Sequence, residues 1–212
     1  GMPDKIDLSF IVEETKTGAI SFSVSHSNNY GISVGAGIQE KNIFGSGNTL
    51  NADLKISKSF NKVSFYFMNP NFNDEEHSVS VGAFKSEIND DDVTKNSYEI
   101  DTTGLTLGYG FPTTKDTRIN TKLVYSKNKI KCGTLFSGPS YESSQCASAN
   151  NDEFKLNVTW SENTLNDFMY PTEGSTNDLE LGLSLPLGDY RYYNLSANHS
   201  SYSSINDNVT LK

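Results

Sequence analysis

The stretch that decides the fold class is residues 179–185, which read Leu-Glu-Leu-Gly-Leu-Ser-Leu. Leu179, Leu181, Leu183 and Leu185 alternate with small or polar residues. Because successive side chains of a strand point to opposite faces, this period of two predicts a β-strand with one apolar face. An amphipathic helix would instead place apolar residues three or four positions apart.

The same period of two recurs along almost the whole chain, whereas helical periodicity is hard to find. The apolar members of these runs are Ile6, Leu8, Phe10 and Val12, then Ile20, Phe22 and Val24, then Ile32, Val34, Ala36 and Ile38, then Leu50, Ala52, Leu54 and Ile56, then Val63, Phe65 and Phe67, then Val79, Val81 and Ala83, then Leu105, Leu107 and Tyr109, then Ile119, Leu123 and Tyr125, then Phe154, Leu156, Val158 and Trp160, and finally Tyr193, Leu195 and Ala197. We therefore predict an all-β chain, an antiparallel meander of about ten strands, and residues 209–212 are compatible with the start of another.

Composition narrows the function classes. The 212 residues carry a net charge of −9, so the clustered Lys and Arg needed to bind phosphate backbones are lacking and no nucleic-acid partner is expected. Aromatic residues make up 11%, which argues against a disordered chain. No run reaches the ~20 apolar residues of a spanning helix.

The connections between the runs are of two kinds. Short ones carry Gly, Pro or Asn, at residues 44–47, 69–72, 110–113 and 170–174, and polar, variable ones lie at residues 25–30, 85–97 and 127–153. Short turns at one end and long loops at the other are typical of an outer-membrane barrel. Alternation alone does not separate such a barrel from a soluble β-sandwich, whose polar faces also meet water.

Residues 160–175, Trp-Ser-Glu-Asn-Thr-Leu-Asn-Asp-Phe-Met-Tyr-Pro-Thr-Glu-Gly-Ser, are the most specific motif. They resemble the signature Trp-x-x-Asn-x-Leu…Phe/Tyr-Pro-Thr-x-Gly-Ser of the bacterial surface-antigen outer-membrane barrel family. The residues that match are Trp160, Asn163, Leu165, Tyr170, Pro171, Thr172 and Gly174. Residues 39–47, 69–72 and 110–112 resemble the earlier turns of that family, in the same order.

The resemblance implies that the chain forms part of a sixteen-stranded transmembrane β-barrel. Residues 1–16 resemble the end of the last periplasmic POTRA domain and its linker, and residues 17–212 the N-terminal part of the barrel. The family's Arg-Gly-Phe motif is absent from these residues. We expect a truncated barrel, which cannot close on a register meant for sixteen strands because strand number, tilt and shear are linked.

The resemblance also implies a location in the bacterial outer membrane and a role in folding and inserting β-barrel proteins there. In the family the first barrel strand is a lateral gate that binds the incoming strand, without a cofactor or a covalent intermediate. Here that strand comprises Gly18, Ala19, Ile20, Ser21, Phe22, Ser23, Val24 and Ser25. The implied partners are unfolded outer-membrane proteins, membrane lipid and accessory lipoproteins. Two alternatives remain: a secretion pore of the related two-partner type, or an unrelated porin-like or soluble β-protein.

Other motifs predict no enzyme and no metal site. Residues 31–35 match the Gly-x-Ser-x-Gly nucleophile elbow, but they lie inside an alternating run with no helix after it. The three His residues are far apart in the chain. Cys132 and Cys146 fall in one expected outer loop, where a disulfide closing a loop of about 15 residues would contribute ~3 kcal/mol.

The alternation also predicts which way individual side chains face in a membrane barrel. The row of Leu179, Leu181, Leu183 and Leu185 and the row of Phe154, Leu156, Val158 and Trp160 should face lipid. Asp53, Lys55, Lys155 and Glu180 should face the lumen. Trp160 and Tyr170 suit the aromatic girdle at the membrane interface.

Overall fold

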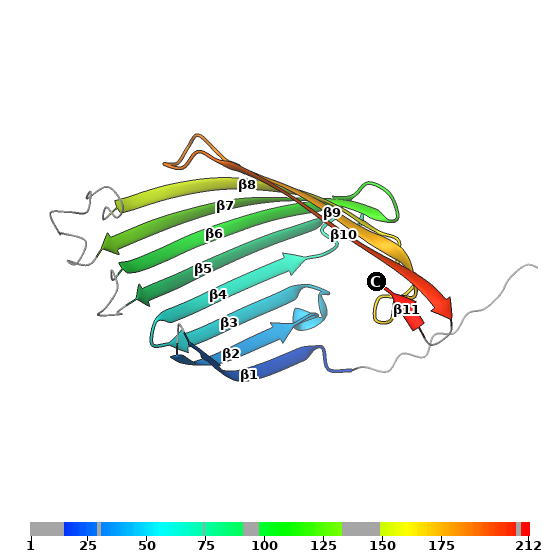
Figure 1. Cartoon of the computed structure of the whole chain (residues 1–212), viewed down its shortest axis with the longest axis horizontal. Helices are drawn as coiled ribbons and strands as arrows, with labels where there is room; N and C mark the ends of the chain where they lie inside the picture. The colour runs from blue at the N-terminus through cyan, green and yellow to red at the C-terminus, as the bar shows by residue number, and fades with distance from the viewer. Residues whose placement is uncertain (1–14, 29–30, 74, 91–97, 133–148, 207–208) are drawn as a thin grey trace, which may run out of the picture.

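A computed structural model describes residues 15–28, 31–73, 75–90, 98–132, 149–206 and 209–212. Across these residues the chain forms one antiparallel sheet of 11 strands that pair in chain order, which confirms the predicted meander (Figure 1). The strands are β1 (Gly18–Ser27), β2 (Gly31–Glu40), β3 (Thr49–Ser57), β4 (Phe60–Asn69), β5 (Ser78–Asp90), β6 (Tyr98–Pro112), β7 (Thr117–Cys132), β8 (Ala149–Asn163), β9 (Glu173–Ser184), β10 (Tyr193–Asn206) and β11 (Val209–Leu211). A single 3-10 turn, η1 (Ile43–Gly45), joins β2 to β3.

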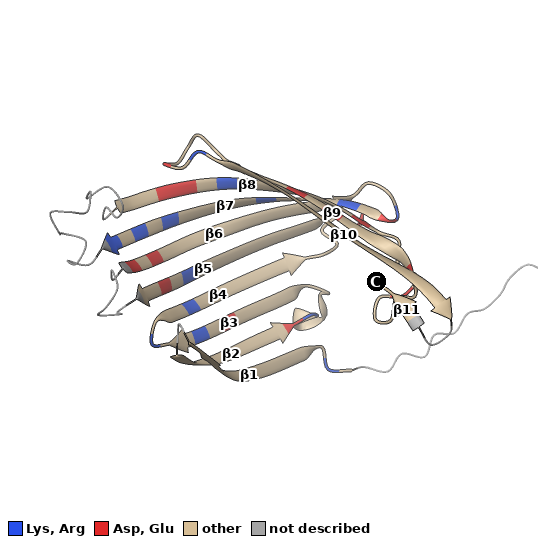
Figure 2. Cartoon of the chain, in the orientation of Figure 1, with Lys and Arg blue, Asp and Glu red and all other residues tan. Residues whose placement is uncertain are grey.

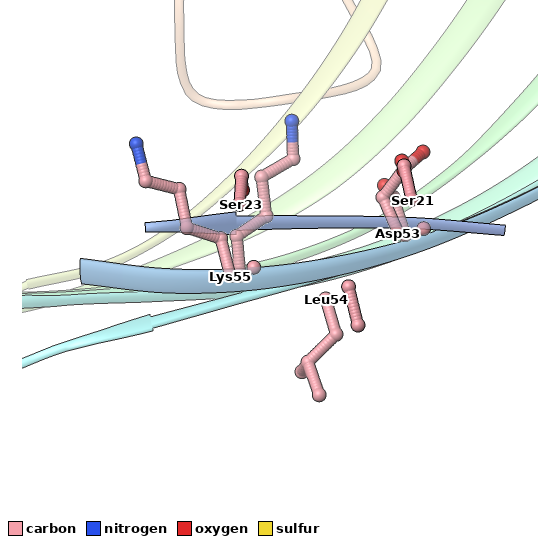
Figure 3. A pocket seen from close by; sticks show the side chains of 10 residues that line it. Ser21, Ser23, Asp53, Leu54 and Lys55 are labelled. Carbon is pink, nitrogen blue, oxygen red and sulfur yellow. The ribbon is translucent and has the colours of Figure 1, made fainter. Parts of the chain in front are cut away.

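The register gives the sheet two chemically different faces. Leu54 of β3 pairs with Ala36 and Val63, whereas the next residue, Lys55, pairs with Gly35 and Lys62. Since paired residues share a face, the apolar rows join into one continuous outer face and the polar rows into an inner face. Figure 3 shows this division at β3, where Lys55 and Leu54 project to opposite sides of the sheet.

The apolar face is uncovered. Among the described residues no hydrophobic side chain is buried, and the two buried polar residues are Ser33 and Ser126. A soluble sandwich would bury its apolar face against a second sheet about 10 Å away, and the described residues form a single sheet. The described residues therefore do not form the two-layer sandwich that the soluble alternative requires, because no second sheet among them covers the apolar face.

The strands near the middle of the sheet are longer than the sequence pattern suggests. β5, β6, β7 and β8 have 13, 15, 16 and 15 residues, and the β6–β7 ladder continues to the pair Tyr98 and Cys132. Residues 85–97 and 127–153 were expected to be loops. Their described parts are strand instead, at Lys85–Asp90, Lys127–Cys132 and Ala149–Glu153. Charged residues replace apolar ones in these parts, so the alternation is lost although main-chain pairing continues.

The predicted turns lie at one end of the sheet. They follow β2, β4, β6 and β8, while β5 and β7 end at the opposite side of the sheet. No helix among the described residues is long and apolar enough to cross a membrane. Residues 1–14 of the expected POTRA segment lie outside the described residues. Cys146 and the side chain of Cys132 also lie outside them, so the disulfide between these two residues stays a prediction.

Candidate functional site

The first candidate is β1, the strand expected to be the gate. All ten of its residues pair with β2, from Gly18 with Glu40 to Ser27 with Gly31. It is an edge strand of the described sheet, with β2 as its one neighbour. In an antiparallel ladder alternate residues direct their N–H and C=O groups to either side, so about five residues of β1 offer these groups to a further strand.

The side chains of β1 receive little packing. Ile20, Phe22 and Val24 are 69%, 82% and 77% exposed on the outer face. On the interior strand β4, Val63 and Phe65 of the same face are 50% and 47% exposed. The difference follows from pairing, since β1 has one neighbour and β4 has two. In the described sheet the apolar row of β1 is therefore covered on one side, by β2.

On the inner face β1 meets glycine. Ser21 pairs with Gly37 and Ser23 pairs with Gly35. A Cβ atom on Gly35 would lie 2.6 Å from Oγ of Ser23, so the serine side chain occupies the space above the glycine. Side-chain interlocking between β1 and β2 is therefore slight, apart from a 2.7 Å hydrogen bond between the hydroxyls of Ser25 and Ser33. Main-chain hydrogen bonds hold β1 in place.

These small residues leave an open groove of about 300 Å³ along the inner face of β1–β4 (Figure 3). The charged residues that line the groove are Asp53, Lys55 and Lys62. Asp53 and Lys55 thus lie on the polar face, where the alternation placed them. Lys55 and Lys62 stand directly opposite each other, a like-charge pair, and the Lys55 ammonium lies 5.8 Å from the centre of the Phe60 ring. The groove is hydrophilic and directly borders the free strand.

The second candidate is the turn between β8 and β9, which contains the signature residues. Gly174 has φ +101°, and a Cβ atom there would lie 2.3 Å from the carbonyl oxygen of Thr164. Only glycine fits this combination of left-handed backbone and close approach. Asn163 accepts a hydrogen bond from the backbone N–H of Leu165 at 3.0 Å, which starts the turn at the position where the signature has Asn.

Two residues that the signature leaves unspecified also build the turn. The Asn166 side-chain oxygen accepts hydrogen bonds from the backbone N–H groups of Thr172 and Glu173 at 3.0 and 3.1 Å. Asp167 accepts from those of Tyr170 and Met169 at 2.7 and 2.8 Å, and these two bonds lower the pKa of its carboxyl. The adjacent Asn166 and Asp167 could have been recognised in the sequence as turn residues, because Asn and Asp side chains favour hydrogen bonds to nearby backbone groups.

Two other residues of the signature, Trp160 and Tyr170, lie at the surface. Trp160 lies on the outer face, paired with Ile119 and Leu179, and Tyr170 is 79% exposed at the tip of the turn. The structure does not bring the turn and the β1 strand together, because the turn joins β8 to β9 and β1 lies at the edge of the sheet.

The remaining motifs have structural explanations. Ser33 lies inside β2 and bonds Ser25, with no helix after it, so the nucleophile-elbow pattern is a strand with small inner residues. Nδ1 of His77 lies 2.5 Å from the Tyr109 hydroxyl, and Nδ1 of His199 lies 2.6 Å from the side-chain oxygen of Asn177. Within the described part of the chain, no group of three His, Cys, Asp or Glu residues is placed to hold a metal ion.

Comparison with known proteins agrees with this geometry. Residues 42–212 match the Omp85 superfamily domain. The chain belongs to the Omp85 superfamily. The match confirms the resemblance seen in the sequence, and it places this Omp85 chain in the bacterial outer membrane. An exposed apolar face is what strands of an outer-membrane barrel require on their lipid side.

Two relatives are outer membrane protein assembly factors named BamA. The one from Neisseria meningitidis serogroup B is 22% identical over 100% of this chain and 28% of the relative. The one from Nitratidesulfovibrio vulgaris is 33% identical over 51% of this chain and 13% of the relative. The Omp85 chain thus spans about a quarter, or less, of the length of these relatives.

A solved structure shows the same fold. The crystal structure of BamA from Haemophilus ducreyi lacking POTRA domains 1–3 superposes with a TM-score of 0.69 at 24% identity. The likeness covers 92% of this chain and 39% of the solved one. The 11-stranded meander is therefore the arrangement found in the barrel of an Omp85 protein.

Proposed function

We propose that this chain is part of an outer-membrane assembly factor, which folds and inserts β-barrel proteins into the outer membrane. Two relatives with that name match it, one of them along the entire chain. The residues from Gly18 to Ser25 act as the gate that receives the incoming strand. The single observation that carries this role is the slight side-chain packing of β1 on β2, which leaves main-chain hydrogen bonds to hold the strand.

The physical basis is the cost of an unpaired strand edge in lipid. The hydrocarbon region offers no water to N–H and C=O groups, so each unsatisfied group there costs several kcal/mol. A client strand that pairs with β1 satisfies these groups on both partners, in the β-augmentation mode. The client strand would also cover Ile20, Phe22 and Val24, which now have one neighbouring strand. Such binding needs no nucleotide and no covalent chemistry.

The signature turn has a supporting role in this proposal. Asn163, Asn166, Asp167 and Gly174 fix the connection between β8 and β9, which keeps the middle of the sheet rigid. The loosely packed β1 can then open without the rest of the sheet following. The client proteins, the lipid and accessory lipoproteins are the partners that this function requires.

The test is disulfide crosslinking in the complete protein, reconstituted in lipid vesicles with an unfolded client barrel. One variant is Ser23→Cys on β1, and the matched control is Ser64→Cys on β4, which faces the same groove but has strands on both sides. A cysteine is placed at successive positions of the client's terminal strand. We expect disulfides at Ser23→Cys with alternate client positions and none at Ser64→Cys.

Two readouts separate the two parts of the proposal. If the complete protein does not speed the folding of the client in vesicles, the assembly function is refuted. If it speeds folding but Ser23→Cys forms no more crosslinks than Ser64→Cys, then the gate role of β1 is refuted and the assembly function stands.

A further inference from the structure

The outer face changes from apolar to charged at a similar level on neighbouring strands. On β7 the outward row continues from Leu123 and Tyr125 to Lys127, Lys129 and Lys131. The same row on β6 passes from Leu105 to Thr103, Asp101 and Glu99, and on β5 from Ala83 to Lys85 and Glu87. Figure 2 shows this charge at the ends of β5–β8 that lie away from the short turns.

Two of the four outward lysines are already paired. The Lys85 ammonium lies 2.5 Å from the carboxylate of Glu87, and that of Lys131 lies 2.8 Å from Glu99. Lys127 and Lys129 are exposed and form no ion pair with a described residue. Asp101 and Asp152 are their neighbours in register and carry the opposite charge, but neither carboxylate forms an ion pair with Lys127 or Lys129; Asp152 accepts a hydrogen bond from the Tyr125 hydroxyl at 3.0 Å.

We propose that Lys127 and Lys129 bind the phosphate groups of anionic lipid headgroups in the adjacent leaflet. The lipid-facing row of β7 ends at Tyr125, so the next outward side chains lie at the height of the headgroups. A lysine there keeps its apolar stem along the sheet and its ammonium in the polar layer. The two charges are two residues apart on one face, about 7 Å along the strand, so they can contact one headgroup or two neighbouring ones.

This inference depends on the placement of the sheet in the membrane and not on the assembly function. Basic residues near an anionic lipid surface each contribute about fivefold in affinity, an attraction that weakens as salt screens it. Two uncompensated lysines would give about 25-fold selectivity for an anionic over a zwitterionic lipid, and the carboxylates of Asp101 and Asp152 opposite them lower this value. The paired lysines, Lys85 and Lys131, are expected to add less because their charge is already compensated.

The experiment counts lipid molecules bound to the complete protein in detergent by native mass spectrometry, with added phosphatidylglycerol or phosphatidylcholine. The test variant is Lys127→Gln with Lys129→Gln. Its matched control is Lys55→Gln with Lys62→Gln, which removes the same charge from the inner face. All four lysines are exposed, so neither double variant leaves a buried cavity, and the control additionally removes the contact of Lys55 with the Phe60 ring.

We expect the wild-type protein and the Lys55/Lys62 variant to prefer phosphatidylglycerol, and the Lys127/Lys129 variant to lose most of that preference. Raising the salt concentration should reduce the preference of the wild-type protein. The proposal is overturned if the Lys127/Lys129 variant keeps its preference, or if both double variants lose it equally, because net charge rather than position would then decide binding.

Discussion

Arginine in place of Leu181 tests which face of the sheet meets lipid. Leu181 is the middle one of the outward leucines Leu179, Leu181 and Leu183 of β9, between Val158 and Leu195 of the neighbouring strands, and it is 39% exposed. Arginine on the lipid face at mid-membrane costs about 2–4 kcal/mol. Since about 1.36 kcal/mol is a tenfold change, the ratio of folded to unfolded protein should fall roughly 30- to 1,000-fold.

The matched variant is Glu180→Arg, one residue earlier on the same strand. Glu180 lies on the inner face between Thr159 and Ser196, where water reaches the side chain, so we expect a change within about 0.5 kcal/mol. Leu181→Ala separates lost packing from added charge and should cost less than Leu181→Arg. The assay is urea unfolding of the complete protein in lipid vesicles, followed by the gel mobility of folded and unfolded forms. Equal losses for the two arginine variants would refute the assignment of faces.

Three further predictions concern the turns. Gly174→Ala should destabilise the protein by about 1–3 kcal/mol in the same urea titration, because of its φ of +101° and the 2.3 Å approach to Thr164; Gly31→Asn, at φ +66° with open space around it, should be tolerated. Asn166→Ala should cost about 1 kcal/mol, since two backbone N–H groups lose their acceptor, while Asn166→Asp should cost less. The lowered pKa of Asp167 means that its stabilisation of the turn is complete above the ordinary Asp value of 3.8 and is lost as the pH falls through the lower value. Amide hydrogen exchange at Met169 and Tyr170 should therefore accelerate in acid, and unchanged protection at low pH would contradict the role of that carboxylate.

The alternation of apolar and polar residues predicted the strands correctly where one face of the strand is apolar. The apolar rows of β8 and β9 share one face of the sheet, as the alternation predicted, while the contact of that face with lipid stays a prediction. The same reasoning missed the outer parts of β7. Beyond Tyr125 the outward residues are Lys127, Lys129 and Lys131, and a strand in water needs no apolar row to keep its main-chain ladder. The alternation of apolar residues therefore locates the apolar part of a strand more accurately than the residue at which the strand ends.

The candidate sites show a similar division. The strand expected as the gate forms as β1, Gly18–Ser27, and its gating role stays a prediction. The sequence predicted only part of the reason for the weak packing of β1 against β2. The serines of β1 could be read directly, but their position over Gly35 and Gly37 depends on register, which follows from the length of the connection between the strands. In the turn, the signature identified Gly174 but not the acceptors Asn166 and Asp167, whose partners are known only from the folded loop.

The serine-over-glycine arrangement of β1 and β2 also bears on sliding. If β1 moved two residues along β2, Ser21 would lie opposite Gly35 instead of Gly37, and every side chain would stay on its own face. The displacement would replace the hydroxyl pair of Ser25 and Ser33 by Ser23 opposite Ser33, and it would lose the pairs at the strand ends. On the inner face, the side chains of such an edge therefore do little to distinguish registers that differ by two residues, which is about 7 Å along the strand.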